Sequence, residues 1–112
     1  MLILKILRRA EWDAFRQAGS TIGAPVDQAD GFIHFSTPAQ VAETVARHFA
    51  SESDLVLVAV DPAGLGDALK WEPSRGGALF PHLYRSLRLS EVVWDKSLPL
   101  GAAGHIFPEG LV

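Results

Sequence analysis

The chain has 112 residues, a mass of 12.1 kDa and a formal net charge of −3, with 48% apolar and 21% charged residues. This length holds one hydrophobic core, and the composition excludes a disordered chain. The sequence contains no cysteine, which excludes disulfides, thiolate metal ligands and cysteine nucleophiles. No apolar run is long enough for a signal-peptide core or a membrane span, so we expect one cytoplasmic domain over residues 1–112.

The acidic net charge argues against an extended nucleic-acid surface. The charge is nevertheless unevenly distributed, because residues 70–88 carry +3 and the remainder carries −6. The four basic residues of this segment are Lys70, Arg75, Arg85 and Arg88. Such a local basic segment suits a small anionic ligand, and a solvated charged rim is an equally weighted interpretation.

The first third of the chain contains two predicted regular elements. Residues 2–7 form an apolar run interrupted by Lys5, which predicts a strand. Residues 10–18 predict a helix, because two aromatic residues lie three apart on one face and Gly19 follows as a stop signal. Residues 20–30 are rich in Gly, Pro, Asp and Ser, which predicts a loop.

A second strand is predicted over residues 31–36. Its alternation directs Ile33 and Phe35 toward a core. The opposite face then carries Phe32, His34 and Ser36. This arrangement is typical of a pocket wall, and the alternative is an edge strand with a solvated polar face.

Residues 38–50 predict a helix packed on a sheet. Thr37 is its N-cap, Pro38 occupies its first position, and Gln40 completes a capping box. An apolar stripe at helical spacing follows, made of Val41, Val45 and Phe49 among others. Because helix N-termini offer free N–H groups, this end suits a phosphate, although Pro38 lacks one of them.

The second half reads as a central strand followed by short elements. Residues 55–60 form a continuous apolar run, which predicts a strand buried on both faces. The following elements are a turn or one-turn helix at 62–68, a strand at 69–72, a flexible loop at 74–77, an extended segment at 79–84 that Pro81 restricts to an edge, a last strand at 89–94, and a surface tail after 98. This order predicts an α+β fold.

Two groups of side chains could carry chemistry. His34 shares its strand face with Ser36, and both precede Thr37, whose hydroxyl and amide could hold a ribose or phosphate oxygen. The second group contains His82 in the aromatic setting of Phe80 and Tyr84. For His34, a structural histidine remains the alternative.

The glycine loop near residue 76 has a charged residue on either side. Glu72 could be a general base or an acceptor for a sugar hydroxyl, and the alternative is an ion pair with Arg75. The four histidines lack the spacing of metal ligands, so we expect no metal.

Three segments together resemble a bacterial family known as domain of unknown function 952. They are residues 2–12, 30–37 and 80–84, and the resemblance covers nearly the whole chain. The family implies no established activity. By fold it belongs with the ADP-ribosyltransferase-like superfamily, which implies a split β-sheet with two main flanking helices and a central cleft.

A weaker likeness is to RNA 2′-phosphotransferases. It rests on the strand 32–37, a helix ending in Arg47-His48, and the stretch 58–61. On this match His34 corresponds to a motif histidine that lies against the NAD-derived moiety, and Ser36 corresponds to the family's serine. The superfamily usually holds the adenosine ribose with another histidine, where this chain has Lys5.

The resemblance therefore implies binding of NAD, ADP-ribose or a related nucleotide, and leaves open the transfer of an ADP-ribosyl or phosphate group. The implied catalytic residues are His34 and Glu72. The implied binding residues are Lys5, His34, Ser36, Thr37, Arg75, Phe80, His82 and Tyr84. The alternative is a non-catalytic module for a small metabolite or a protein partner, and the oligomeric state stays open.

Overall fold

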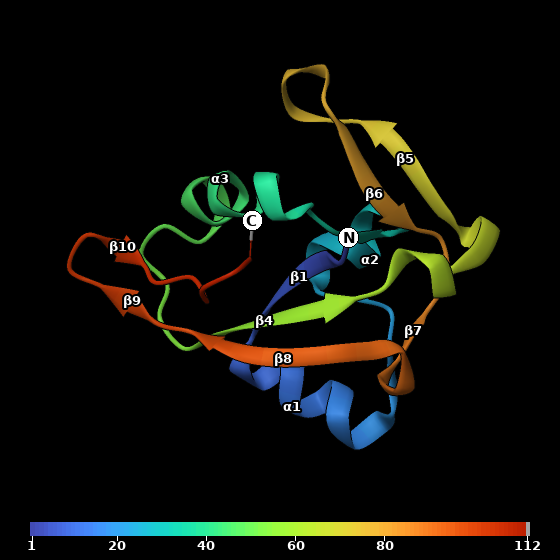
Figure 1. Ribbon diagram of the computed structural model, residues 1–112. Coiled ribbons are helices and arrows are strands. Elements are labelled where there is room, and N and C mark those ends of the chain that lie inside the picture. The colour runs from blue at the N-terminus through green and yellow to red at the C-terminus, as the bar shows by residue number, and fades with distance from the viewer. Residues whose placement is uncertain (112) are drawn as a thin grey trace.

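The computed structural model describes residues 1–111, with the side chain of Arg75 outside the described part. Within these residues, two three-stranded antiparallel sheets form the frame of an α+β domain (Figure 1). The first sheet has the order β1-β4-β8, formed by Ile3–Arg8, Leu55–Val60 and Val92–Leu98. The second has the order β3-β6-β5, formed by Ile33–His34, Leu79–Leu83 and Leu69–Pro73. An isolated bridge between Leu4 and Ser36 joins the two sheets.

Helices cover both faces of the first sheet. Helix α1 (Arg9–Ala18) and helix α3 (Pro38–His48) lie on opposite sides of it in Figure 1. One core contains Trp12 and Phe15 of α1 together with the side chains on one face of β4. The other core contains the buried valines of α3 together with the side chains on the opposite face of β4. The predicted central strand at 55–60 and the predicted helix start at Pro38 are therefore confirmed.

Shorter elements connect this frame. Strand β2 (Ser20–Thr21) pairs with β7 (Leu87–Arg88), and β9 (Leu100–Gly101) pairs with β10 (Gly104–His105). Two 3₁₀ turns occupy Pro62–Gly64 and Gly66–Ala68, as predicted for that region. The loop predicted at 74–77 contains a tight turn at Arg75–Gly77, in which Gly76 has the left-handed conformation at φ 65°.

The prediction of a loop over residues 20–30 is wrong. Besides β2, the segment contains helix α2 (Pro25–Asp30). Pro25 occupies the first helical position, and the carboxylate of Asp27 accepts from the backbone N–H of Ala24 at 2.7 Å. Gly31 ends the helix in the left-handed conformation, at φ 86°. These start and stop signals outweigh the loop-like composition.

Three strand predictions need correction. Strand β6 lies in the middle of its sheet, so Pro81 is not on an edge strand. A proline is tolerated in this strand because β3 pairs with β6 only through Ile33 and His34. Beyond these two residues, the carbonyl of Pro81 accepts a hydrogen bond from the backbone N–H of Phe35 at 3.0 Å. The strand at 31–36 is correspondingly short. The last strand begins at Val92 rather than at residue 89, because a 3₁₀ turn at Leu89–Glu91 precedes it.

Candidate functional site

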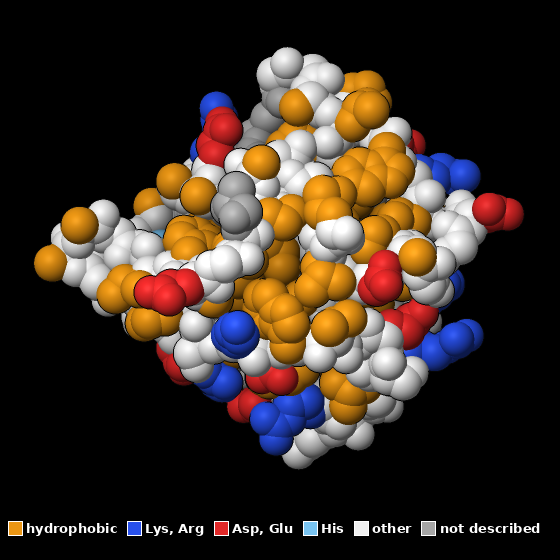
Figure 2. Space-filling view, in the orientation of Figure 1, with side chains coloured by type: hydrophobic (Ala, Val, Ile, Leu, Met, Phe, Trp, Pro, Cys, Tyr) orange, Lys and Arg blue, Asp and Glu red, His pale blue; other side chains and the backbone are white. Residues whose placement is uncertain are grey.

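A hollow of about 680 Å³ opens between β1, α2, β3, α3 and the β5–β6 hairpin. Five of the residues predicted from the sequence line it, namely Lys5, His34, Ser36, Phe80 and His82. Thr37 instead lines a second hollow of about 530 Å³ next to the N-terminus, on the face where apolar side chains gather in Figure 2. The fold thus brings residues from distant parts of the sequence to one cavity.

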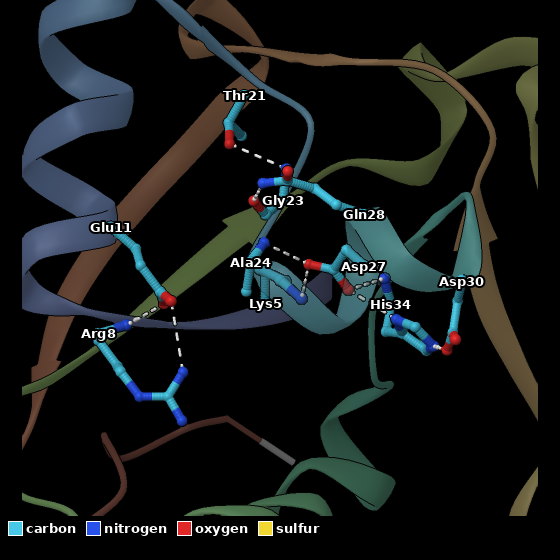
Figure 3. A network of polar contacts seen from close by, with 10 residues as sticks. All are labelled: Lys5, Arg8, Glu11, Thr21, Gly23, Ala24, Asp27, Gln28, Asp30 and His34. Atoms are coloured by element: carbon cyan, nitrogen blue, oxygen red, sulfur yellow. Dashed lines mark hydrogen bonds and ion pairs between the residues drawn. The ribbon is translucent and has the colours of Figure 1, made fainter.

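Lys5 is held by the carboxylate of Asp27, which lies in helix α2 and not in a loop as the composition predicts. Its ammonium nitrogen lies 2.7 Å from Oδ2 of Asp27, and both side chains are buried (Figure 3). The alternation of β1 directs Lys5 toward α2, and the first turn of α2 presents Asp27 to it. The lysine charge is therefore compensated within the protein.

The same carboxylate orients His34. Oδ1 of Asp27 lies 2.6 Å from Nδ1 of His34 and accepts from its backbone N–H at 3.0 Å. On the other side of the ring, Nε2 lies 3.0 Å from Oδ2 of Asp30, whose side chain is exposed (Figure 3). His34 is thus fixed between two acids of helix α2, one buried and one at the surface.

The contacts of Asp27 stabilise its ionised form. Burial alone would raise the pKa of Asp27, but the hydrogen bond to His34 and the ion pair with Lys5 outweigh it and lower the pKa to about 2. Burial also lowers the pKa of Lys5, and Asp27 opposes that shift. The chain therefore keeps a buried carboxylate charged at neutral pH through its hydrogen bonds to His34 and its ion pair with Lys5.

A second imidazole is oriented by Glu72. Nδ1 of His82 lies 2.9 Å from Oε1 of Glu72, and the Tyr84 hydroxyl donates to the same oxygen at 2.6 Å. The hydrogen bond from Tyr84, followed by that from His82, lowers the pKa of Glu72, and the contact with Glu72 raises the pKa of Tyr84. Glu72 and Tyr84 therefore stand beside His82.

Phe32 joins these groups into one cluster. Its ring centroid lies 4.6 Å from that of His34, 4.2 Å from that of His82 and 5.1 Å from that of Tyr84. The two imidazole centroids are 5.4 Å apart. Residues of β3 and β6 that face each other in the register, His34 and His82, thus share one wall of the hollow.

Two other lining residues complete the polar surface. The Ser36 hydroxyl hydrogen-bonds that of Thr44 at 2.9 Å. Arg8, which sequence reasoning missed, pairs with Glu52 at 2.7 Å, and its guanidinium lies over the ring of Phe49. Arg8 lies next to Arg9 at the end of an apolar strand, and this pattern does not indicate a pocket residue. Asp27 could have been identified from the sequence, because it lies three residues after Ala24 in a turn that begins with a proline.

Of the basic residues in the segment 70–88, Lys70, Arg85 and Arg88 lie outside this cavity, although Phe80 and His82 of the same segment line it. Lys70 donates to a backbone carbonyl at 3.4 Å, and Arg85 pairs with Glu91 at 2.7 Å. Neither residue lines the hollow, nor does Arg88. The predicted role of Arg75 falls on a side chain outside the described part of the structure.

Two searches of the described residues gave negative results. No group of three or more His, Cys, Asp or Glu side chains in residues 1–111 is arranged to hold a metal ion. Within the same part of the chain, no helix has the length and apolar character needed to cross a membrane.

The fold and the cavity define a small α+β protein with a pocket between two antiparallel sheets, whose largely apolar lining carries a few polar and charged side chains. The family model for proteins of unknown function called DUF952 matches residues 6–95, and the chain belongs to this family. The predicted family membership is therefore confirmed.

Solved structures show the same architecture. The crystal structure of protein CC0527 from Caulobacter crescentus is 54% identical, with a TM-score of 0.90 over 94% of this chain and 92% of that chain. Its solution NMR structure gives 55% identity and a TM-score of 0.84, over 93% of this chain and 90% of that chain. No curated protein sequence matches the chain.

Proposed function

We propose that the chain binds a small anionic nucleotide-like ligand, such as NAD, ADP-ribose or a mononucleotide, in the hollow beside His34 and His82. The observation that carries the proposal is the pairing of two oriented imidazoles in a cavity of about 680 Å³. This volume lies in the range of about 300–1,000 Å³ that is usual for small-molecule sites. Its lining contains five side chains able to carry positive charge and one carboxylate, Asp30.

The lining suggests a role for each group. His34 would reach a phosphate or ribose oxygen through Nε2 in place of the exposed Asp30 carboxylate, and His82 would donate to another such oxygen. Arg8, which also lines the hollow, would hold a second phosphate. Phe80 would contact a base or nicotinamide ring. Lys5 would act mainly through Asp27, because its ammonium already has a buried partner.

The proposal also includes two more specific points, namely an ADP-ribosyltransferase-like fold and group-transfer chemistry in the same hollow. The fold assignment rests on the resemblance to the domain of unknown function 952, and the chemistry rests on the likeness of residues 32–37, 47–48 and 58–61 to the RNA 2′-phosphotransferases. In that chemistry Glu72 would accept from a ribose hydroxyl while His34 contacts the NAD-derived moiety. Release of nicotinamide from NAD, measured by chromatography, tests this part separately from binding.

The second candidate is a non-catalytic module that binds a small metabolite. Two observations favour it over transfer: the Lys5 ammonium is neutralised by Asp27, and Glu72 already accepts from both His82 and Tyr84. A protein with this function would bind its ligand without turnover.

Isothermal titration calorimetry with NAD, ADP-ribose and AMP, at low and high salt, tests the proposal. We expect binding that weakens with salt, because the ligand's charge is screened. His82→Gln should weaken binding roughly tenfold through loss of a charge-assisted contact. His105→Gln is the matched control, because this ring bonds the Glu52 carbonyl and does not line the hollow. Absence of binding by all three nucleotides would reject the proposal.

A further inference from the structure

We propose that two copies of this chain associate through the open edge of strand β5, in an antiparallel pair centred on Trp71. Strand β5 is the outer strand of the sheet β3-β6-β5, and no strand of the described residues pairs with its outer side. In Figure 1 it lies on the outer border of a hairpin that projects from the domain. An open strand edge offers backbone groups to which another chain can add a strand. The association goes beyond nucleotide binding and does not depend on it.

The backbone of Trp71 faces this open edge. Trp71 lies opposite Pro81 in the register of β5 and β6. The carbonyl of Pro81 accepts from the backbone N–H of Phe35, so the backbone of Pro81 faces β3 and not β5. Opposed residues of an antiparallel pair alternate between those that exchange hydrogen bonds and those that do not, and Trp71 and Pro81 are of the second kind. The N–H and C=O of Trp71 therefore point outward and can bond those of Trp71 in a second copy.

The side chains on one face of this hairpin are apolar and exposed. Trp71 is 41% exposed, and Leu79, which shares its face according to the register, is 52% exposed. Exposed aromatic side chains are enriched at protein interfaces. A pair centred on Trp71 places the two indole rings next to each other, so that each ring covers apolar surface of the other copy.

The opposite face carries charges that match under two-fold symmetry. A two-fold axis at Trp71, perpendicular to the joined sheet, sets residue 70 of one copy opposite residue 72 of the other. Lys70 then faces Glu72 of the second copy, and the same contact forms a second time by symmetry. Opposite charges directly across an antiparallel pair stabilise it, so this register is self-complementary.

Both charged groups have room for a further partner. Lys70 makes only a 3.4 Å contact with the carbonyl of Asp67. In Glu72, Oε1 accepts from His82 and Tyr84, and Oε2 has no hydrogen bond or ion pair among the described residues. Because Glu72 orients His82, which lines the hollow, association brings a cation of the second copy to the border of the candidate site.

Strand β8 is another open edge, and its charges do not match in this way. It is the outer strand of the first sheet and contains Asp95 and Lys96 next to each other. Consecutive strand residues point to opposite faces, so no symmetric register sets these two side chains opposite each other. Lys70 and Glu72 are two positions apart and share a face. Charge matching therefore selects β5.

The contact is short, which limits its strength. The Leu69 N–H already donates to the Gly66 carbonyl, and Pro73 has no N–H to donate. Interfaces of small area are transient, so we expect a dissociation constant of roughly 10–1,000 μM. The protein should therefore exchange between monomer and dimer as its concentration changes.

Sedimentation equilibrium of the full chain, at concentrations up to about 1 mM, tests the association. The apparent mass should rise from 12.1 kDa toward twice that value. Lys70→Glu sets like charges opposite each other and should weaken association at least about tenfold. The double variant Lys70→Glu with Glu72→Lys exchanges the two charges and should restore it. Lys96→Glu on β8 is the matched control, because it makes the same change in net charge and should keep wild-type association.

Amide hydrogen exchange followed by NMR locates the contact without any substitution. Exchange of the Trp71 N–H should slow as the concentration of the wild type rises, because this group gains a partner only in the dimer. The amides of β8 should exchange at an unchanged rate. Circular dichroism spectra matching the wild type show that each variant has folded.

Three results would overturn the proposal. The first is a wild type that stays monomeric up to about 1 mM, above the expected dissociation constant. The second is a dimer that Lys70→Glu leaves intact or that the charge exchange does not restore. The third is a dimer in which the Trp71 amide is not protected. None of these results bears on nucleotide binding, which calorimetry measures separately.

Discussion

The ammonium group of Lys5 lies 2.7 Å from Oδ2 of Asp27, with side-chain exposures of 8% and 0%. This pair connects β1 to α2, and the same carboxylate of Asp27 also holds the ring of His34. Breaking a buried pair leaves the remaining charge uncompensated, so Asp27→Asn should lower the free energy of unfolding by about 3–5 kcal/mol. Urea denaturation followed by circular dichroism measures the loss.

Asp30→Asn is the control for this substitution. Its carboxylate also contacts His34, but the side chain is 48% exposed. We expect it to cost about 1 kcal/mol at most, because exposed ion pairs contribute little. Equal losses of unfolding free energy in the two variants would show that the buried pair with Lys5 contributes no more to stability than the exposed contact of Asp30.

Acid should weaken the protein through Asp27. The pKa of Asp27 in the folded protein is about 2, below its ordinary value of 3.8, so its ionised form stabilises the fold above the ordinary pKa. This stabilisation is lost as the pH falls through the folded pKa. The difference in unfolding free energy between wild type and Asp27→Asn should therefore narrow by about 2 kcal/mol between about pH 5 and about pH 2. A constant difference over that range would contradict the assignment.

Gly23 should tolerate no side chain, because of Asp27. A Cβ at this position would lie 2.3 Å from Oδ2 of Asp27, and its φ is +96°. Gly31 has a similar φ of +86° but open space around its Cβ position. Gly31→Ala should therefore cost only its backbone strain of about 1 kcal/mol, and Gly23→Ala should cost more and also weaken nucleotide binding. Equal unfolding midpoints for the two variants would refute the steric account.

The centre of β4 should dominate the stability of the core. Leu57 of β4 is fully buried on the face of the first sheet that α3 covers, so Leu57→Ala should cost about 2–5 kcal/mol in urea denaturation. Val93, at 53% exposure on β8, is the control, and its replacement by alanine should change stability by about 0.5 kcal/mol or less. A small loss at Leu57 would contradict the two-sided burial of this strand.

The main frame follows from local sequence patterns. The buried run of β4, the start of α3 at Pro38 and the core positions Ile33 and Phe35 depend on periodicity and capping within a few residues. Such signals act between neighbours in the chain, so they are readable without knowing the fold. Family membership was equally predictable, because it rests on short motifs.

The site depended on the tertiary structure. That Lys5 meets Asp27 and that Glu72 meets His82 follows from the packing of α2 on β1 and from the pairing of β5 with β6. The middle position of Pro81 likewise depends on which strands flank β6. The sequence alone determined which segments become strands and helices, whereas the sheet pairings decided which charges neutralise each other, because electrostatic contacts depend on distance in space rather than on separation along the chain.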